Sequence, residues 1–168
     1  MQPIVPTFYD FVRTAIFHQN VALQMLTANP NRINARSSSG ETALHYVVIE
    51  NYLEAARFLI DRGADVNTTS GDETPLIHAT VLGYHEMVVL LIAHGANIEA
   101  RDLCESTPFL LAAAHGYTDI CDTLLHASAD AHVRDCFHHS VWDVALTRKR
   151  QQIVDVLAKH GHFETDEV

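Results

Sequence analysis

The sequence has no long hydrophobic run and few basic residues, and both absences narrow the choice of function. No uninterrupted apolar run approaches the ~20 residues that a membrane-spanning helix needs, so we expect no membrane insertion. The chain carries 11 Lys and Arg residues against 21 Asp and Glu residues, which gives a formal net charge of −10. Because nucleic-acid binding needs a cationic surface, this balance predicts no nucleic-acid partner.

Cysteine is also scarce, and an odd count of 3 without regular spacing is typical of a reducing compartment. Residues 1–17 lack both a basic segment and a smooth apolar segment, so they do not read as a signal peptide. A hydrophobic fraction of 48% with 19% charged residues argues against disorder. We therefore expect one folded cytoplasmic domain, with the nucleus or leaderless secretion into a host as alternatives.

Four stretches of equal length are built to the same plan. They begin at Thr42, Thr74, Thr107 and Ser140, so their starting points are almost evenly spaced along the chain. A domain with a single core has no reason to keep such a period, whereas a protein made of stacked repeats does.

The stretch from Thr74 shows what one repeat would form. Thr74 can cap a first helix, and Pro75 suits its first position because the missing N–H has no partner there anyway. That helix should run from 75 to about 82 and end at Gly83, and a second should run over 85–94. Both are shorter than the ~12–15 residues at which an isolated helix becomes marginal, so each must be held by neighbouring repeats. The polar links between repeats should form a row of projecting hairpins.

This pattern resembles the ankyrin repeat, whose period is about 33 residues. The resemblance rests on Thr-Ala-Leu-His at 42–45, Gly-Ala-Asp-Val-Asn at 63–67, Thr-Pro-Leu at 74–76 and the glycines at 83 and 116. It implies an all-α solenoid of helix–turn–helix repeats joined by short β-hairpin-like loops. We divide residues 1–168 into an N-terminal capping repeat (1–36), three inner repeats (37–69, 70–102, 103–135) and a C-terminal capping repeat with a tail (136–168).

Departures from the pattern give further expectations. Counting back one period from Thr42 starts the first repeat at Tyr9. Asn51 and Ser128 stand where other repeats have a helix-ending glycine; asparagine tolerates the left-handed conformation there, and serine should weaken its junction.

The resemblance implies a binding module that uses its concave face and hairpin tips. We expect a non-enzymatic protein, monomeric by itself and without cofactors, that binds one or more partner proteins as a scaffold, inhibitor or targeting factor. The alternative is a dedicated regulatory subunit of one enzyme or channel. One tight stoichiometric complex would favour the regulator, and several weak complexes would favour the scaffold. The sequence contains neither a glycine-rich phosphate loop nor a nucleophile elbow, and a solenoid offers an open groove rather than an enclosed pocket.

The repeat register selects the candidate partner-binding residues. They are Arg36, Glu41, Tyr46, Ile49, Glu50, Glu73, His78, Val81, Leu82, Arg101, Leu103, Cys104, His115, Arg134, Phe137, His139 and Arg148. Apolar side chains at 81, 82, 103, 104 and 137 would form an exposed patch, unless they fold under their hairpins or join the core. Acidic residues at 41, 72, 73, 102, 105 and 135 suggest a partner with an apolar anchor flanked by basic groups, unless they serve solubility alone.

The histidines have three possible roles, two structural and one in metal binding. His45 should be a structural imidazole, as the family motif implies, while His94, His126 and His160 end second helices, where they can meet the negative helix dipole. A metal-dependent activity would need the cluster His132, Cys136, His138 and His139, with Cys104 nearby; its donors suit zinc but its spacing matches no zinc finger, and we expect no metal there.

Covalent chemistry has two candidates. A Cys104–Cys136 disulfide is not expected, because stacked helices lie about 8–10 Å apart, beyond the reach of the bond. Asn67 resembles an asparagine that some ankyrin proteins present to a hydroxylase, although its ordinary role is a hairpin hydrogen bond.

Overall fold

Short helices make up most of the computed structural model, which describes residues 7–148 and 150–161. In chain order they are α1 (Phe8–Phe17), α2 (Gln19–Ala28), the 3-10 helix η1 (Pro30–Asn34), α3 (Ala43–Ile49), α4 (Leu53–Ile60), α5 (Pro75–Val81), α6 (His85–Ala93), α7 (Pro108–His115), α8 (Thr118–His126), α9 (Val141–Thr147) and α10 (Gln151–Lys159). Within these residues, β-structure is limited to three isolated bridges. No helix in the described ranges is both long and apolar enough to cross a membrane. The tail predicted at the C-terminus lies outside the described residues.

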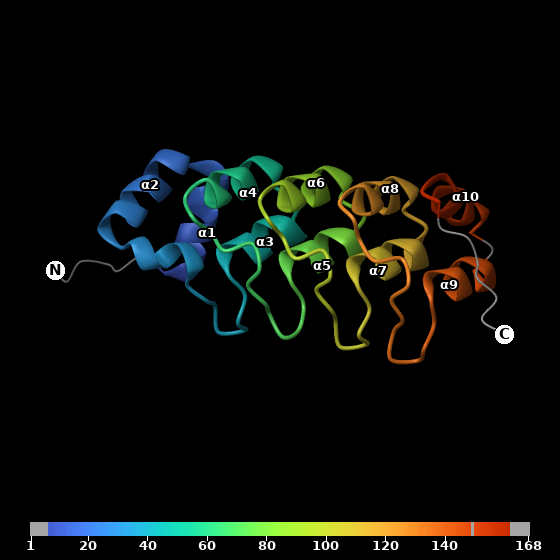
Figure 1. Cartoon of the computed structure of the whole chain (residues 1–168). Coiled ribbons are helices and arrows are strands. Elements are labelled where there is room, and N and C mark those ends of the chain that lie inside the picture. The colour runs from blue at the N-terminus through green and yellow to red at the C-terminus, as the bar shows by residue number, and fades with distance from the viewer. Residues whose placement is uncertain (1–6, 149, 162–168) are drawn as a thin grey trace.

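The helices stand in two layers. Figure 1 shows the first helices of the pairs (α1, α3, α5, α7 and α9) in one row and the second helices (α2, α4, α6, α8 and α10) in the other. The links between pairs project from the first row as a series of hairpins. The predicted all-α solenoid with hairpin-like loops is thereby confirmed.

Side-chain caps set the helix starts as the sequence predicts. The Thr74 hydroxyl accepts the backbone N–H of Ile77 at 3.3 Å, and the Thr107 hydroxyl accepts that of Leu110 at 3.4 Å. Each cap satisfies an N–H that has no partner inside the helix. The predicted helices over 75–82 and 85–94 are α5 and α6, each one residue shorter than expected.

The first repeat begins earlier than the period predicts. Its cap is Thr7 rather than Tyr9: the Thr7 hydroxyl accepts the N–H of Asp10 at 3.2 Å, and the Asp10 carboxylate accepts the N–H of Thr7 at 2.9 Å. This reciprocal capping box fixes the start locally, so α1 is longer than the other first helices. The prediction that the repeat starts at Tyr9 was wrong for that reason.

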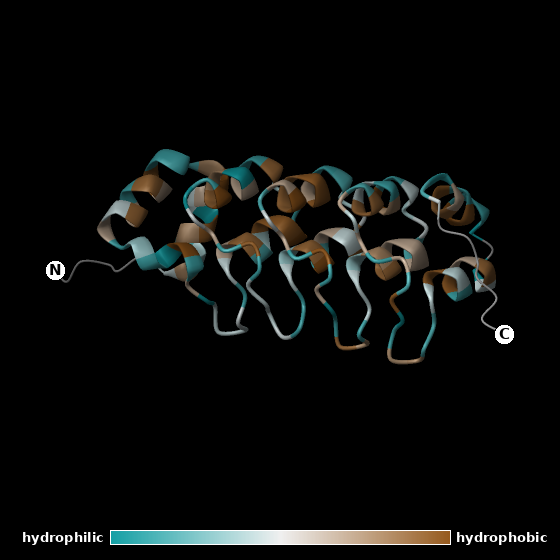
Figure 2. Ribbon diagram, in the orientation of Figure 1, coloured by the Kyte–Doolittle hydropathy of each residue, from teal (hydrophilic) through white to brown (hydrophobic). Residues whose placement is uncertain are grey.

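The core is a continuous apolar layer between the two rows of helices. In Figure 2, hydrophobic residues (brown) occur on the helices of both rows. The largest fully buried residues of the core are Phe11, Leu44, Leu59, Leu76, Ile77, Met87, Leu91, Phe109, Leu110, Ile120, Leu124 and Ile153. Because every repeat contributes, each helix pair is stabilised by the pairs beside it.

Asparagine side chains link each loop to the next. The side-chain oxygen of Asn67 accepts the N–H of Asn97 at 2.7 Å, and its amide donates to the Gly95 carbonyl at 3.0 Å. Asn34 makes the same two kinds of bond one repeat earlier. The equivalent position one repeat later is an alanine, and the neighbouring Glu99 supplies the acceptor for the following loop instead. Asn67 therefore has the hairpin role given above as the ordinary one.

Two glycines that end helices should respond differently to a methyl group. Gly83 and Gly95 have φ of +74° and +82°, a region in which any L side chain costs about 1 kcal/mol. An added Cβ at Gly83 would lie 2.8 Å from Cζ of Tyr117, whereas nothing lies within 4 Å at Gly95. The Tyr117 ring cannot move freely because it is half-buried and stacks on His115.

We therefore expect Gly83→Ala to lower the free energy of unfolding by clearly more than Gly95→Ala does. Urea denaturation of both variants would measure the difference. Equal losses would show that the contact between Gly83 and Tyr117 is loose.

Candidate functional site

A hollow of about 440 Å³ opens between α7, α9 and the two hairpins that precede these helices. We name it the inner groove. It is lined by Asp102, Cys104, Ser106, Leu110, Leu111, Ala114, His115, Asp135, Phe137, His139, Asp143, Val144, Thr147 and Arg148. The groove thus combines an apolar floor, provided by the helices, with a polar hairpin rim.

An aspartate folds each of the two hairpins. One carboxylate oxygen of Asp102 accepts the N–H groups of Cys104 and Ser106, both at 2.8 Å. Asp135 does the same for Phe137 and His139, both at 2.9 Å. Partial burial opposes ionisation of Asp135, but these bonds outweigh it and lower the pKa of its carboxyl. The two carboxylates therefore hold the turns together.

Large apolar side chains are exposed on the hairpin turns and at the end of α5. Leu103 is 81% exposed and Phe137 is 68% exposed, and Val81 and Leu82 also lie at the surface. The alternative that they fold beneath the hairpins or join the core is therefore wrong. Phe137 adjoins the inner groove, whereas Leu103, Val81 and Leu82 lie outside its lining.

Neighbouring hairpins approach each other more closely than the helices do. The N–H of Cys136 donates to the carbonyl of Cys104 at 2.8 Å, so the two backbones are in hydrogen-bond contact at this point. Both cysteines are exposed free thiols. The expected helix spacing of about 8–10 Å was thus the wrong measure of their separation, because it does not apply at the hairpins.

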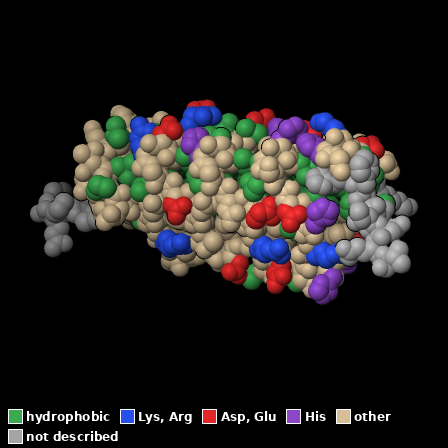
Figure 3. Space-filling view, viewed as in Figure 1, with side chains coloured by type: hydrophobic (Ala, Val, Ile, Leu, Met, Phe, Trp, Pro, Cys, Tyr) green, Lys and Arg blue, Asp and Glu red, His purple; other side chains and the backbone are tan. Residues whose placement is uncertain are grey.

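Three arginines at equivalent repeat positions stabilise the hairpins by hydrogen bonds. Arg36, Arg101 and Arg134 each donate to the backbone carbonyl four residues further along their own hairpin, at 2.8, 3.0 and 2.8 Å. Arg36 also donates to the carbonyl of Thr69 in the next hairpin, and Arg101 to that of Arg134 at 3.4 Å. Figure 3 shows basic and acidic side chains interspersed along this side of the molecule. These guanidinium groups stabilise the loops whether or not a partner is bound.

Several candidate residues nearer the N-terminus form hydrogen bonds or polar contacts with neighbouring side chains. Glu41 accepts hydrogen bonds from the hydroxyls of Ser39 and Ser37, and these bonds lower the pKa of its carboxyl. The Tyr46 hydroxyl lies 3.2 Å from that of Tyr9. His78 forms a similar contact, with Nδ1 at 3.1 Å from a carboxylate oxygen of the neighbouring Glu73.

The groove brings together only part of the predicted site. Cys104, His115, Phe137, His139 and Arg148 line it, and the other twelve candidates do not. Sequence reasoning missed Leu110, Leu111, Ala114, Asp143 and Val144. A signal was present: positions 111 and 144 are the fourth residues after a cap, the same register that places Tyr46 and His78 among the candidates.

The cluster of His132, Cys136, His138 and His139, which a metal-dependent activity would need, is not among the converging groups of the described residues. Nδ1 of His139 lies 3.2 Å from a carboxylate oxygen of Asp135, and the backbone N–H of Cys136 donates to the carbonyl of Cys104. Within the described residues, the metal-ligating side chains that do converge are Asp122, His126 and His160, whose ligand atoms all lie within 4.8 Å of one another.

Comparison with known proteins agrees with the architecture. A family model of three consecutive ankyrin repeats matches residues 12–102, and a single-repeat model matches residues 104–136. The chain is 31% identical over 137 residues to the mouse B-cell lymphoma 3 protein homolog, covering 80% of this chain and 30% of that protein.

Two further relatives show the same kind of partial match. The human B-cell lymphoma 3 protein is 32% identical over 127 residues, covering 74% of this chain and 27% of that protein. Mouse Rabankyrin-5 is 30% identical over 142 residues, covering 76% of this chain and 12% of that protein. The chain thus spans less than a third of the length of each of these relatives. With the matched repeats covering most of its residues, this chain belongs to the ankyrin-repeat family.

Proposed function

We propose that this protein binds a partner protein through the inner groove and the hairpin tips beside it. The observation that carries the proposal is an open hollow of about 440 Å³ with the exposed ring of Phe137 at its edge. A large apolar side chain in solvent next to an apolar concavity is typical of a protein-binding surface. An open groove suits recognition of a protein surface better than chemistry that must exclude water, so we propose no enzymatic role.

The charges favour a partner with basic groups beside an apolar anchor. Asp102 and Asp135 turn their carboxylates inward to hairpin N–H groups, so they offer little to a partner. Glu105 is more available, because its side chain is exposed and its contact with Arg101 is as long as 3.9 Å. With a net charge of −10, the whole chain would also attract a basic partner.

The biological setting follows from the same features. Scaffolding, inhibition and targeting all fit an open binding face, and a dedicated regulatory subunit would use the same surface with one partner. The exposed thiols of Cys104 and Cys136 favour a reducing compartment such as the cytoplasm. Measuring the mass of the purified complex would separate a regulator in fixed stoichiometry from a scaffold with several partners.

Substitution at the groove tests the proposal. We expect Phe137→Glu to weaken capture of the specific partner by about 30-fold or more, the loss typical of a central interface residue. Val89→Glu is the matched control, because Val89 is also an exposed apolar residue but lies on α6 in the other helix row.

Affinity purification followed by measurement of the dissociation constant would report both effects, and circular dichroism would confirm that both variants fold. Equal retention of the partner by the Phe137 and Val89 variants would exclude the inner groove.

A further inference from the structure

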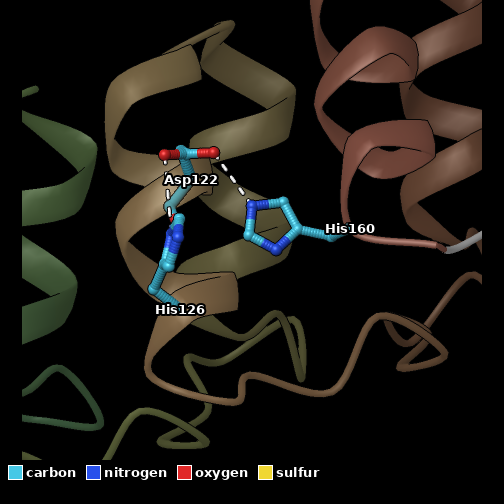
Figure 4. Close-up of side chains that lie close together, drawn as sticks. All are labelled: Asp122, His126 and His160. Carbon is cyan, nitrogen blue, oxygen red and sulfur yellow. Dashed lines mark hydrogen bonds and ion pairs between the residues drawn. The ribbon is translucent and has the colours of Figure 1, made fainter.

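We propose that Asp122, His126 and His160 form a binding site for a divalent transition-metal ion, with zinc as the ion tested first. Asp122 and His126 lie four residues apart on α8, so they share one face of that helix. His160 directly follows α10 in the next repeat. Figure 4 shows both imidazoles beside the carboxylate of Asp122, one from each side of the junction between the repeats.

The separations suit a metal site. A carboxylate oxygen of Asp122 lies 2.9 Å from Nε2 of His160, and the three ligand atoms all lie within 4.8 Å of one another. Zinc forms bonds of about 2.0–2.2 Å to nitrogen and oxygen, which in tetrahedral geometry places ligand atoms about 3.4 Å apart. Movements of about 1 Å would bring this group into that range, with water completing the coordination. Imidazole nitrogen is a preferred donor for zinc, copper and nickel.

One histidine already makes a hydrogen bond of the kind that metal-ligating histidines make, and the same ring lies close to the carboxylate, with Nδ1 3.5 Å from an oxygen of Asp122. Nδ1 of His126 lies 2.7 Å from the backbone carbonyl of Asp122, so this nitrogen carries the proton and donates it. The lone pair of the neutral ring is then on Nε2. Histidines that bind metals commonly donate their other ring N–H to a carbonyl or carboxylate in this way, which fixes the tautomer and the ring.

A lysine competes for the same carboxylate. Nζ of Lys159 lies 2.7 Å from the Asp122 oxygen that also faces His160. Its side chain is 61% exposed, so the ammonium can move into water at low cost when an ion arrives. Without metal, Lys159 forms an ion pair with Asp122, and the two imidazoles lie beside the same carboxylate. With metal, the two imidazoles and the carboxylate would share one cation.

Binding would join the last two repeats. α8 belongs to the fourth helix pair and α10 to the fifth, and the two helices pack against each other. A ligand that binds only the folded arrangement stabilises it, so zinc should raise the melting temperature by an amount that grows with its concentration.

Calorimetric titration of the full chain with zinc chloride tests the site. Cys104→Ser and Cys136→Ser are introduced throughout, because the adjacent thiols could bind zinc independently. We expect one ion per chain, with roughly tenfold or greater weakening in His126→Gln and in His160→Gln. His94→Gln is the control: His94 also ends a second helix, and its Nδ1 also faces a backbone carbonyl, at 2.8 Å, but it is not part of the cluster.

Removal of the competing ammonium gives an independent outcome. Lys159→Ala should tighten zinc binding, whereas a site elsewhere would not respond to this change. The zinc-dependent rise in melting temperature should disappear in His160→Gln and reverse on addition of a chelator. Absence of binding heat, or equal weakening by His94→Gln and His160→Gln, would overturn the proposal. These readouts involve no protein partner, so they stand apart from the test of the inner groove.

Discussion

Phe109→Ala is expected to lower the free energy of unfolding by about 3–5 kcal/mol, whereas Phe137→Ala should change it by about 0.5 kcal/mol or less. The same side chain is removed in both variants, but Phe109 is 0% exposed and Phe137 is 68% exposed. Truncation of Phe109 leaves a cavity in α7, which packs against both α5 and α9. Contacts with the repeats on both sides are therefore lost, and in a solenoid these interfaces supply much of the stability.

Urea denaturation followed by circular dichroism would measure both values. The midpoint of the Phe109 variant should fall strongly, and that of the Phe137 variant should match the wild type. A loss below about 1 kcal/mol for Phe109→Ala would mean that the surrounding repeats close around the cavity. Phe137→Ala also separates an effect on folding from an effect on partner binding, because we propose that this side chain contacts the partner but does not support the core.

Local signals in the sequence were sufficient to predict most of the architecture. Thr74, Pro75 and Gly83 define α5 because each acts on the backbone within a few residues of itself. Asn51 and Ser128 have φ of 58° and 70°, so both take the left-handed conformation of the glycines they replace. Such features need no knowledge of distant contacts, which explains why the helix bounds and the projecting hairpins were predictable.

Features that depend on contacts between repeats were harder to predict. The first helix begins at a capping box that overrides the period, and the Cys104–Cys136 approach depends on how far the hairpins lean together. The cluster around Asp122 was missed for a related reason. His126 and His160 were recognised as helix-ending histidines, but nothing in their spacing shows that both rings face one carboxylate across a repeat junction.

The inner groove illustrates the same distinction. The repeat register selected His115 and Arg148, which both line the groove, because both follow their caps by the same interval. It did not indicate that the hollow lies between α7 and α9, since its size depends on the small Ala114 and on how the hairpins stand. Tyr46 stands at the same register position as Leu111 and Val144 of the groove, but it contacts neighbouring side chains instead.

Acidification from pH 7 to pH 4 is expected to cost about 3 kcal/mol of folding free energy through His45 alone. His45 is 0% exposed, and its Nδ1 accepts the N–H of Thr42 at 3.2 Å, so the neutral ring helps to cap α3. Burial, and secondly the nearby His78, lower the pKa of His45 from its ordinary 6.5 to about 4. Between these two values the unfolded chain binds a proton that the folded chain does not, so stability falls as the pH falls through this range and is constant above it.

The variant His45→Gln isolates this contribution. It should be less stable than the wild type at pH 7, because the cap is lost, yet its stability should decline less steeply between pH 6.5 and pH 4. Burial also lowers the pKa of His78, so part of the slope should remain. The carboxyl of Glu41, whose pKa is lowered, loses its contribution only below about pH 4.5 and so affects mainly the acid end. Urea midpoints at several pH values would measure the slope of stability against pH, with His115→Gln as a control at an exposed histidine. An unchanged slope in His45→Gln would show that the buried imidazole is already protonated or free to leave its site.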